Sequence, residues 1–342
     1  MPAPLVRVDP TQPEAAAIGE AAAVLSSGGL VAFPTETVYG LGADALDARA
    51  VARLFEVKGR PADNPIIVHV ASPTDVDALA THVGATARVL IDRFWPGPLT
   101  LVLPAAPVVP EVTRGGLPTV AVRMPAHAVA LALIAAARRP VAAPSANRSG
   151  RPSPTTAQHV LADLGERIDL VLDAGPAPVG VESTVVDVSG TTPVLLRPGG
   201  LPLEALQAAV GAVALPAPGA AATARSPGTR YRHYAPRARV VLVEGRPDAG
   251  ERVAAAVRRL WDEGLRVGAM VTSEGAAGVP AGAVVRVMGP RAAPEVIAAN
   301  LFAQLRELDE AGLDAIVVEG VAERGLGRAV MDRLRRAAAG AG

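Results

Sequence analysis

The sequence has little or none of several residue types on which common functions depend. None of its 342 residues is cysteine, which excludes disulfides, thiolate catalysis and cysteine-ligated zinc, and which fits a reducing cytoplasm. Its 33 basic residues balance its 33 acidic ones, so a strongly charged surface for nucleic acid or membranes is not expected. A local basic groove stays open.

Long apolar runs are also missing. The longest uncharged one, Ala128 to Ala137, is far shorter than the ~20 residues that a membrane-spanning helix needs. The first residues lack the charged and then apolar layout of a signal peptide. We therefore predict a soluble, cytoplasmic protein without membrane contacts.

Lysine is almost missing as well. Lys58 is the only one, and the other 32 basic residues are arginine. Lysine is a compact point charge that suits phosphate, whereas arginine is a planar fork, so this single ammonium group is a candidate phosphate ligand. A cation at the end of a helix also favours the helix dipole, by roughly 0.3–1 kcal/mol. From this feature alone, both interpretations of Lys58 stay open.

Residues 30–69 hold the densest group of candidate functional side chains. The apolar run from Leu30 to Phe33 predicts a buried strand. Hydroxyl groups and a carboxylate follow at the exit of this strand, where ligands of α/β sheets usually bind. The residues that supply them are Thr35, Glu36, Thr37 and Tyr39.

A helix is predicted to follow, with Asp47 as its N-cap and Gly59 just past its end. Its apolar face extends to Lys58, and Arg60 and Asn64 lie in the proline-stiffened loop behind it. The next apolar run ends at His69. A lone histidine at such a position is more often structural than catalytic.

Polar residues also mark the strands farther along the chain. Thr119 begins an alternating strand that ends at Arg123. In the loop APSANRSGRPSP, Ser145 and Asn147 supply short donors and acceptors, and Ser153 before a proline suits the N-cap of the next helix. Such a helix start can receive a phosphate, or the serine can merely cap its own helix.

Ser183 begins a β-branched run, and Arg197 ends the next strand. Lys58, Arg60, Arg123 and Arg197 would together place cations beside hydroxyl-rich strand ends, as a cradle for a polyphosphate does. Neither standard nucleotide fingerprint is present in the sequence, and neither a nucleophile elbow nor a zinc-protease motif occurs. This leaves catalysis by placed charges, without a covalent nucleophile.

The length and the apolar half of the composition favour two domains. We predict a catalytic domain over residues 1–211, a linker over 212–238 and a smaller domain over 239–342. The linker contains a low-complexity Pro/Ala stretch and then SPGTRYRHYAP, which is either a lid over a ligand or a docking clip between domains. The last part alternates strands and helices, which predicts a three-layer Rossmann-like domain.

Seven segments of the chain, taken in order, resemble the threonylcarbamoyl-AMP synthase family, the YrdC-like proteins. They are PTETVYGLG, KGRPADNP, FWPGPLT, TVAVRMP, APSANRSG, GVESTVVD and LLRPGG. SPGTRYRHYAP and the C-terminal part resemble the longer, two-domain form of that family. The resemblance implies an α/β fold, with a twisted, open sheet of mixed strand direction in the YrdC-like domain.

The resemblance also implies an enzyme, a nucleotidyltransferase that makes L-threonylcarbamoyladenylate and pyrophosphate from L-threonine, bicarbonate or CO2, and ATP with Mg²⁺. The product would serve N6-threonylcarbamoyladenosine modification of tRNAs that read codons beginning with A. Partner proteins would carry out the transfer to tRNA, and the chain itself would have at most a weak tRNA contact.

The family's binding roles can be carried over to matching positions. Those implied for L-threonine are Thr37, His69, Arg123, Ser183 and the backbone of Ala143. Those implied for ATP are Arg60, Asn64, Thr119, Ser145, Ser153, Arg197 and Tyr234. We add Lys58 as a phosphate ligand and take Lys58 and Arg60 as the catalytic cations; metal ligands are not predicted. His69 would either deprotonate the amine or only position threonine.

Two other functions were weighed. An RNA-binding module without nucleotide turnover would use the same cations for phosphodiesters, but the zero net charge and the threonine-sized cluster of hydroxyls favour the enzyme. A carbamoyltransferase of hydrogenase maturation also uses a YrdC-like domain. It would need cysteine-rich zinc modules, which this sequence lacks.

Overall fold

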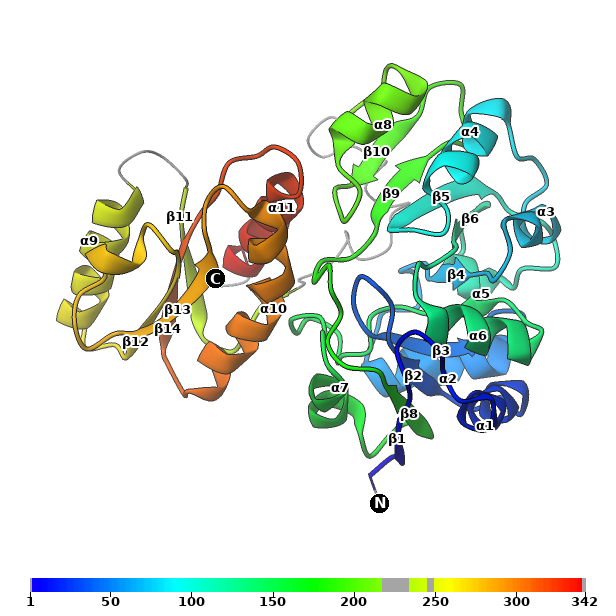
Figure 1. Ribbon diagram of the computed structural model, residues 1–342, viewed down its shortest axis with the longest axis horizontal. Coiled ribbons are helices and arrows are strands. Elements are labelled where there is room, and N and C mark those ends of the chain that lie inside the picture. The colour runs from blue at the N-terminus through cyan, green and yellow to red at the C-terminus, as the bar shows by residue number, and fades with distance from the viewer. Residues whose placement is uncertain (1, 217–233, 245–248, 340–342) are drawn as a thin grey trace. The chain divides into compact units, whose positions relative to one another are not determined.

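The computed structural model describes residues 2–216, 234–244 and 249–339 (Figure 1). They form two compact units, which we treat separately. The first contains residues 2–149, 153–178 and 182–216, and the second contains 150–152, 179–181 and the described residues from 234 onward. Most of the predicted linker therefore lies outside the described residues. Within them, no helix has the length and apolar character to cross a membrane.

The first unit is built on a mixed sheet in which ten described strands follow the order β1-β8-β2-β3-β7-β4-β6-β5-β9-β10. Parallel and antiparallel neighbours alternate irregularly; β2, for example, is parallel to β8 and antiparallel to β3. The predicted sheet of mixed direction is thus confirmed. The strands are β1 (Leu5–Arg7), β2 (Val31–Phe33), β3 (Gly40–Asp44), β4 (Ile67–His69), β5 (Leu99–Pro104), β6 (Thr119–Arg123), β7 (Val141–Ala142), β8 (Leu170–Asp173), β9 (Thr184–Asp187) and β10 (Val194–Arg197).

Helices cover the sheet through two apolar cores. One core joins α1 (Ala15–Ser26) and α6 (Ala128–Ala137) to the sheet, and the larger core lies on the other side of the strands. Strand β2 shows the division, because Val31 and Phe33 enter the first core whereas Ala32 enters the second. The remaining helices are α2 (Ala48–Lys58), α3 (Val76–Leu79), α4 (Ala85–Phe94), α5 (Glu111–Arg114), α7 (Ala157–Leu164) and α8 (Leu203–Val210), with a 3₁₀ turn at Pro73–Asp75.

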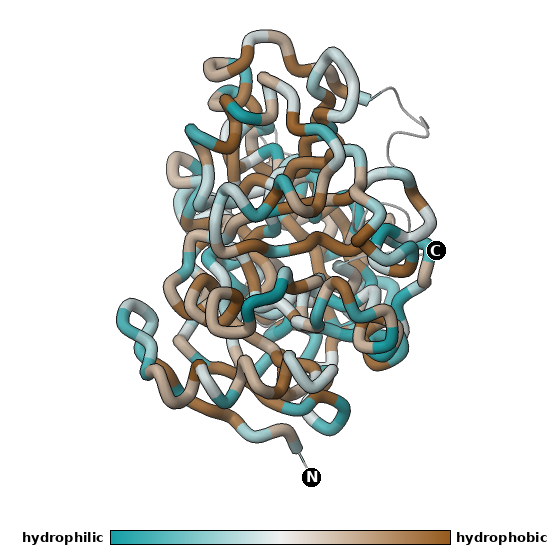
Figure 2. The backbone as a smooth tube through the Cα atoms, turned by 90° about the vertical axis from the view of Figure 1, so that its right-hand side faces the viewer, coloured by the Kyte–Doolittle hydropathy of each residue, from teal (hydrophilic) through white to brown (hydrophobic). Residues whose placement is uncertain are grey.

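A third, smaller apolar cluster consists of strand residues alone within the described chain. Its members are Ile67, Val102, Ala121, Val185 and Leu196, from five neighbouring strands. The tube in Figure 2 shows brown, apolar segments alternating with teal, hydrophilic ones along the chain. The polar side chains of the candidate site lie on the same face of the sheet as this cluster.

Helix α2 forms as the sequence predicts. The carboxylate of Asp47 accepts hydrogen bonds from the backbone N–H groups of Arg49 and Ala50, and Gly59 adopts a left-handed conformation with φ of 60°. Lys58 is buried on the same face as Leu54. The helix therefore ends at Lys58, whose ammonium group lies in the protein interior.

Two features of the first unit differ from the prediction. Ser153 is not the N-cap of the next helix: α7 begins at Ala157, and the side chain of Thr156 caps it by accepting from the N–H of His159. Strand β3, which carries Gly40 and Gly42, is not among the predicted strands. A Cβ on Gly42 would lie 2.9 Å from the ring of Phe33, so the glycine allows close packing inside the sheet.

The second unit contains a parallel sheet of strand order β11-β14-β12-β13 with helices on both faces (Figure 1). This confirms the predicted three-layer, Rossmann-like arrangement. Its elements are β11 (Arg239–Val243), α9 (Ala249–Asp262), β12 (Val267–Thr272), a 3₁₀ turn at Ala276–Gly278, β13 (Val284–Gly289), α10 (Pro294–Glu310), β14 (Ala315–Glu319) and α11 (Gly327–Ala338).

Candidate active site

The strands bring several predicted site residues to one face of the first sheet. His69 and Arg123 are directly paired in the parallel register of β4 and β6. Thr119 and Arg123 are an even number of residues from Ala121, so all three share the face of the small apolar cluster. The same alternation places Ser183 on that face, two residues before Val185. One side of the sheet therefore collects these polar groups.

A β-bulge brings Arg197 to the same face. Leu195 pairs with Val186, yet Arg197 pairs with Val185, so β10 has one extra residue at this point. Without it, Arg197 would pair with Thr184 and face the opposite side of the sheet. A bulge that redirects a side chain in this way is common next to active sites.

The guanidinium of Arg123 is the most buried cation on this face. Its Nε donates to the carbonyl of Gly97 at 3.2 Å, and its Nη1 donates to Oγ1 of Thr37 at 2.9 Å. Its Nη2 lies 2.6 Å from a carboxylate oxygen of Glu36. The loop after β2 therefore supplies both the hydroxyl and the carboxylate that hold Arg123.

His69 is buried beside Arg123 and stays neutral. Burial and the nearby Arg123 guanidinium lower the pKa of His69 to about 3. The backbone of Val141 is one hydrogen-bond partner of its ring, and its Nδ1 lies 3.3 Å from the carbonyl of Ile67. The N–H of Ala143 donates to the same carbonyl. A ring with so low a pKa is suited to accept a hydrogen bond rather than to remove a proton.

Ser183 and Arg197 form a second group. Both Nε and Nη2 of Arg197 donate to the backbone carbonyl of Ser183, at 3.2 and 2.8 Å, and Nη2 also lies 3.2 Å from its hydroxyl. The Ser183 hydroxyl in turn lies 2.7 Å from that of Thr100. Arg197, at the end of β10, is thereby held beside the hydroxyl of Ser183, which precedes the neighbouring strand β9.

Lys58 connects α2 to the serine- and asparagine-containing loop. Its ammonium donates to the backbone carbonyls of Ser145 and Asn147. Burial, and then repulsion from Arg60, hold the pKa of Lys58 well below its usual range. Its predicted contact with phosphates is not tested by these distances. They do show that it fixes the loop carrying Ser145.

Arg60 folds back over its own loop. Its Nε donates to the carbonyl of Asn64 at 3.2 Å and its Nη2 to the carbonyl of Pro65 at 2.8 Å, while the guanidinium lies 6.0 Å from the ring centre of Phe55. Asn64 is fully buried. The predicted pair Arg60 and Asn64 is therefore brought together.

The other two predicted residues, Ser153 and Tyr234, belong to different units. The hydroxyl of Ser153 donates to the buried carboxylate of Glu182 in the first unit. Tyr234 belongs to the second unit, where its ring stacks on Phe302 at 5.3 Å and lies 5.2 Å from the guanidinium of Arg333. The rest of the predicted aromatic-basic cluster, residues 230–233, lies outside the described residues.

Two polar residues of this region, Thr100 and Glu182, carried no prediction, and Glu36 was singled out at the exit of a strand without a specific role. Thr100 had a detectable signal, because it interrupts the apolar strand Leu99 to Leu103 on its site face. Glu182 had none beyond its place in a loop. Among the described residues, no three histidine, aspartate or glutamate side chains gather as a metal site.

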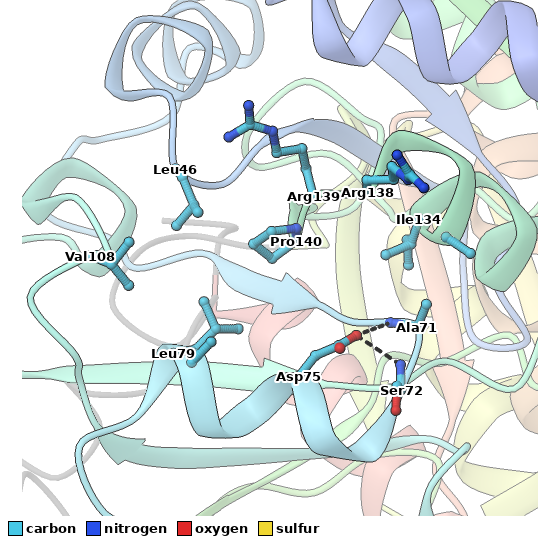
Figure 3. A pocket seen from close by; sticks show the side chains of 12 residues that line it. Leu46, Ala71, Ser72, Asp75, Leu79, Val108, Ile134, Arg138, Arg139 and Pro140 are labelled. Carbon is cyan, nitrogen blue, oxygen red and sulfur yellow. Dashed lines mark hydrogen bonds between the residues drawn. The ribbon is translucent and has the colours of Figure 1, made fainter.

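A separate pocket of about 700 Å³ lies in the first unit between α3 and the end of α6 (Figure 3). Leu79, Ile134 and Pro140 are part of its apolar lining, and Arg138 and Arg139 extend beside it. The carboxylate of Asp75 is occupied by two backbone N–H groups. None of the predicted site residues lines this pocket within the described chain.

Comparisons with known proteins cover most of the chain. A family model described as "Telomere recombination", for Sua5, YciO and YrdC proteins, matches residues 23–199. One described as "Threonylcarbamoyl-AMP synthase, C-terminal domain" matches residues 201–339.

Individual relatives agree with the family models. The threonylcarbamoyl-AMP synthase of Pyrococcus abyssi is 52% identical, over 93% of this chain and 92% of that protein. The one from Bacillus subtilis is 46% identical, over 94% and 93%. Among solved structures, the crystal structure of P. abyssi Sua5 complexed with L-threonine is similar with a TM-score of 0.93 and 48% identity, over 98% of both chains.

Proposed function

Because the chain belongs to the threonylcarbamoyl-AMP synthase family, we propose that the polar face of its first sheet is where L-threonine and ATP react. The chain is an L-threonylcarbamoyladenylate synthase, a nucleotidyltransferase of tRNA modification, and its substrates include threonine and ATP. The finer assignments below are proposals about this chain's own residues.

L-threonine is assigned to the group around Arg123. The guanidinium of Arg123 is the partner for the substrate carboxylate, and the Thr37 hydroxyl beside it lies within reach of the same ligand. His69 offers a neutral imidazole ring, which suits a contact with the substrate's hydroxyl or amine. Ser183 and the backbone of Ala143 complete the set. A pKa of about 3 favours His69 as a positioning group rather than a base.

ATP is assigned to a set of cations, hydroxyl groups and one amide, of which Tyr234 belongs to the second unit and the others to the first. These are Lys58, Arg60, Asn64, Thr119, Ser145, Ser153, Arg197 and Tyr234. The carbamate formed from threonine's neutral amine and CO2 must attack the α-phosphate while pyrophosphate leaves. Since every partner in that step is an anion, fixed guanidinium and ammonium groups lower the repulsion where charge accumulates. We assign this role to Lys58 and Arg60. Lys58 holds the loop that carries Ser145, and Arg60 lies in the loop that follows α2.

Mg²⁺ is proposed to arrive as part of the MgATP substrate. Mg²⁺ is typically held by substrate phosphates and a few carboxylates or waters rather than by an all-protein cage, and the described residues contain no three-ligand cluster. Bicarbonate or CO2 is the proposed third substrate. Delivery of the product to tRNA is proposed to need separate transfer proteins, with at most a weak tRNA contact here.

One observation supports the assignment of the substrate L-threonine. The buried guanidinium of Arg123 donates to the hydroxyl of Thr37 and lies beside the buried, neutral ring of His69. The test is pyrophosphate release by the purified full chain with MgATP, adding threonine and bicarbonate separately and together. Release should require both. Arg123→Gln should lose it, whereas Arg49→Gln, on the exposed side of α2, should keep it. Pyrophosphate release that does not depend on threonine, or that the Arg123→Gln variant retains, would contradict the assignment.

A further inference from the structure

Glu36 and Arg123 form a buried ion pair whose hydrogen-bonding capacity is largely unused. The side chains are only 9% and 4% exposed, and the Glu36 oxygen lies 2.6 Å from Nη2 of Arg123. Within the described residues, neither oxygen of Glu36 makes a well-aligned hydrogen bond, and Nη2 of Arg123 makes none either. Buried charged atoms in this condition are uncommon in folded proteins and call for an explanation.

The neighbours of Arg123 indicate what the pair is for. Two guanidinium nitrogens are already directed at Gly97 and Thr37, so the edge that remains for a substrate carboxylate is the one facing Glu36. Glu36 therefore occupies, with its own carboxylate, the edge that an amino acid would use. A ligand that approaches this edge meets both charges at once.

We propose that Glu36 is the partner of the substrate's ammonium group, a role that rests on the proposed assignment of Arg123 to the substrate carboxylate. In this structure Glu36 pairs with Arg123. When an amino acid binds, its carboxylate takes the Arg123 edge and Glu36 pairs with its ammonium instead. Glu36 thereby selects a zwitterion and positions its nitrogen.

Charge balance explains the selectivity. A zwitterion adds no net charge to the buried pair, so each carboxylate ends beside a cation. A carboxylate that lacks an ammonium group would leave two anions on one guanidinium in a site of low dielectric. The two histidines nearby do not compensate: burial lowers the pKa of His127 despite the attraction of Glu36, and the pKa of His69 is about 3.

Calorimetric titration of the full chain can measure this selectivity directly. L-threonine is compared with (3R)-3-hydroxybutyrate, which is threonine without its amino group. The unchanged chain should prefer threonine by well over tenfold, an energy of more than about 1.4 kcal/mol. Glu36→Gln should reduce that preference at least about tenfold, by weakening threonine and strengthening hydroxybutyrate. Glu20→Gln, an exposed change on α1, should leave it unaltered.

Two further variants separate this proposal from the assignment beneath it. Glu36→Asp keeps the charge and should retain much of the preference, which also covers the case in which Glu36→Gln does not fold. Arg123→Gln should abolish binding of both ligands. If it does, and the preference is the same with glutamine at position 36 as with glutamate, Glu36 has no such role while the Arg123 assignment stands. If Arg123→Gln still binds threonine, both are wrong.

Discussion

The Lys58 ammonium donates to the backbone carbonyl of Asn147 and to that of Ser145, two residues before it. The end of α2 is thus connected to a loop almost ninety residues later in the chain. The lysine head donates to both as a compact point charge, whereas an arginine would donate as a planar fork. The single lysine of the sequence acts at least as an anchor for a proposed nucleotide loop.

Lys58→Ala tests this anchor. The change leaves one buried and one partly buried carbonyl without their partner, which should lower the free energy of unfolding by about 1–3 kcal/mol. Turnover should fall more steeply, by about 100-fold or more, because the loop and a cation are lost together. Denaturant unfolding and pyrophosphate release measure the two effects. Unchanged turnover in a folded variant would exclude a catalytic contribution of Lys58.

The neutral state of His69 predicts a dependence of stability on pH. Its pKa is about 3 in the folded chain against 6.5 when exposed, so between these values the unfolded chain binds more protons. The free energy of unfolding should therefore rise with pH across this window, with a slope of at most about 1.4 kcal/mol per pH unit from this group. Stability from this group is lost as the pH falls from 6.5 toward 3.

His69→Asn removes the titrating ring from the same place. Denaturant unfolding at several pH values should then show a shallower slope between pH 3 and 6.5 than the unchanged chain does. His82→Asn, which alters an exposed histidine, should preserve the slope. A slope that is equal in all three proteins would mean that His69 is not held neutral by burial.

Gly42→Ala should destabilise the first unit. The added Cβ would lie 2.9 Å from the Phe33 ring and 2.9 Å from a methyl group of Val141, too close for a packed sheet. Overpacking of this kind typically costs about 1–3 kcal/mol of unfolding free energy. Gly19→Ala on α1 meets nothing within 4 Å and should be stabilising by up to about 1 kcal/mol. Thermal unfolding of the pair compares the two signs directly, and equal stability would contradict the packing argument.

Local patterns predicted much of the fold because the physics that sets them is local. The cap of Asp47, the left-handed Gly59 and the strand from Thr119 to Arg123 all form at the predicted places. Strand β3 was missed because its glycines are required by contacts with Phe33 and Val141, which are distant in sequence. Ser153 was misassigned as a cap since a serine before a proline has the same local pattern whether it caps a helix or bonds to Glu182.

The candidate site divides in the same way. Sequence patterns singled out Arg123 and Thr37 as polar residues at strand ends, and the structure brings them together. The pairing of Arg123 with Glu36 depends on how the loop after β2 folds over β6, which no short-range pattern encodes. The face on which Arg197 lies likewise depends on a bulge at Leu196. One extra residue in a strand leaves no recognisable pattern in the amino-acid sequence, so the sequence does not predict this bulge.

Arg197→Lys tests whether this bulge serves the reaction. Lysine keeps the charge, but it cannot reproduce the two guanidinium bonds to the Ser183 carbonyl, at 3.2 and 2.8 Å, that fix the cation on the site face. The KM for ATP should rise by about tenfold or more, with a smaller change in the KM for threonine. Arg7→Lys, at the far edge strand of the same sheet, should alter neither. If threonine binding suffers instead, Arg197 serves the amino acid through Ser183, and its assignment to ATP is wrong.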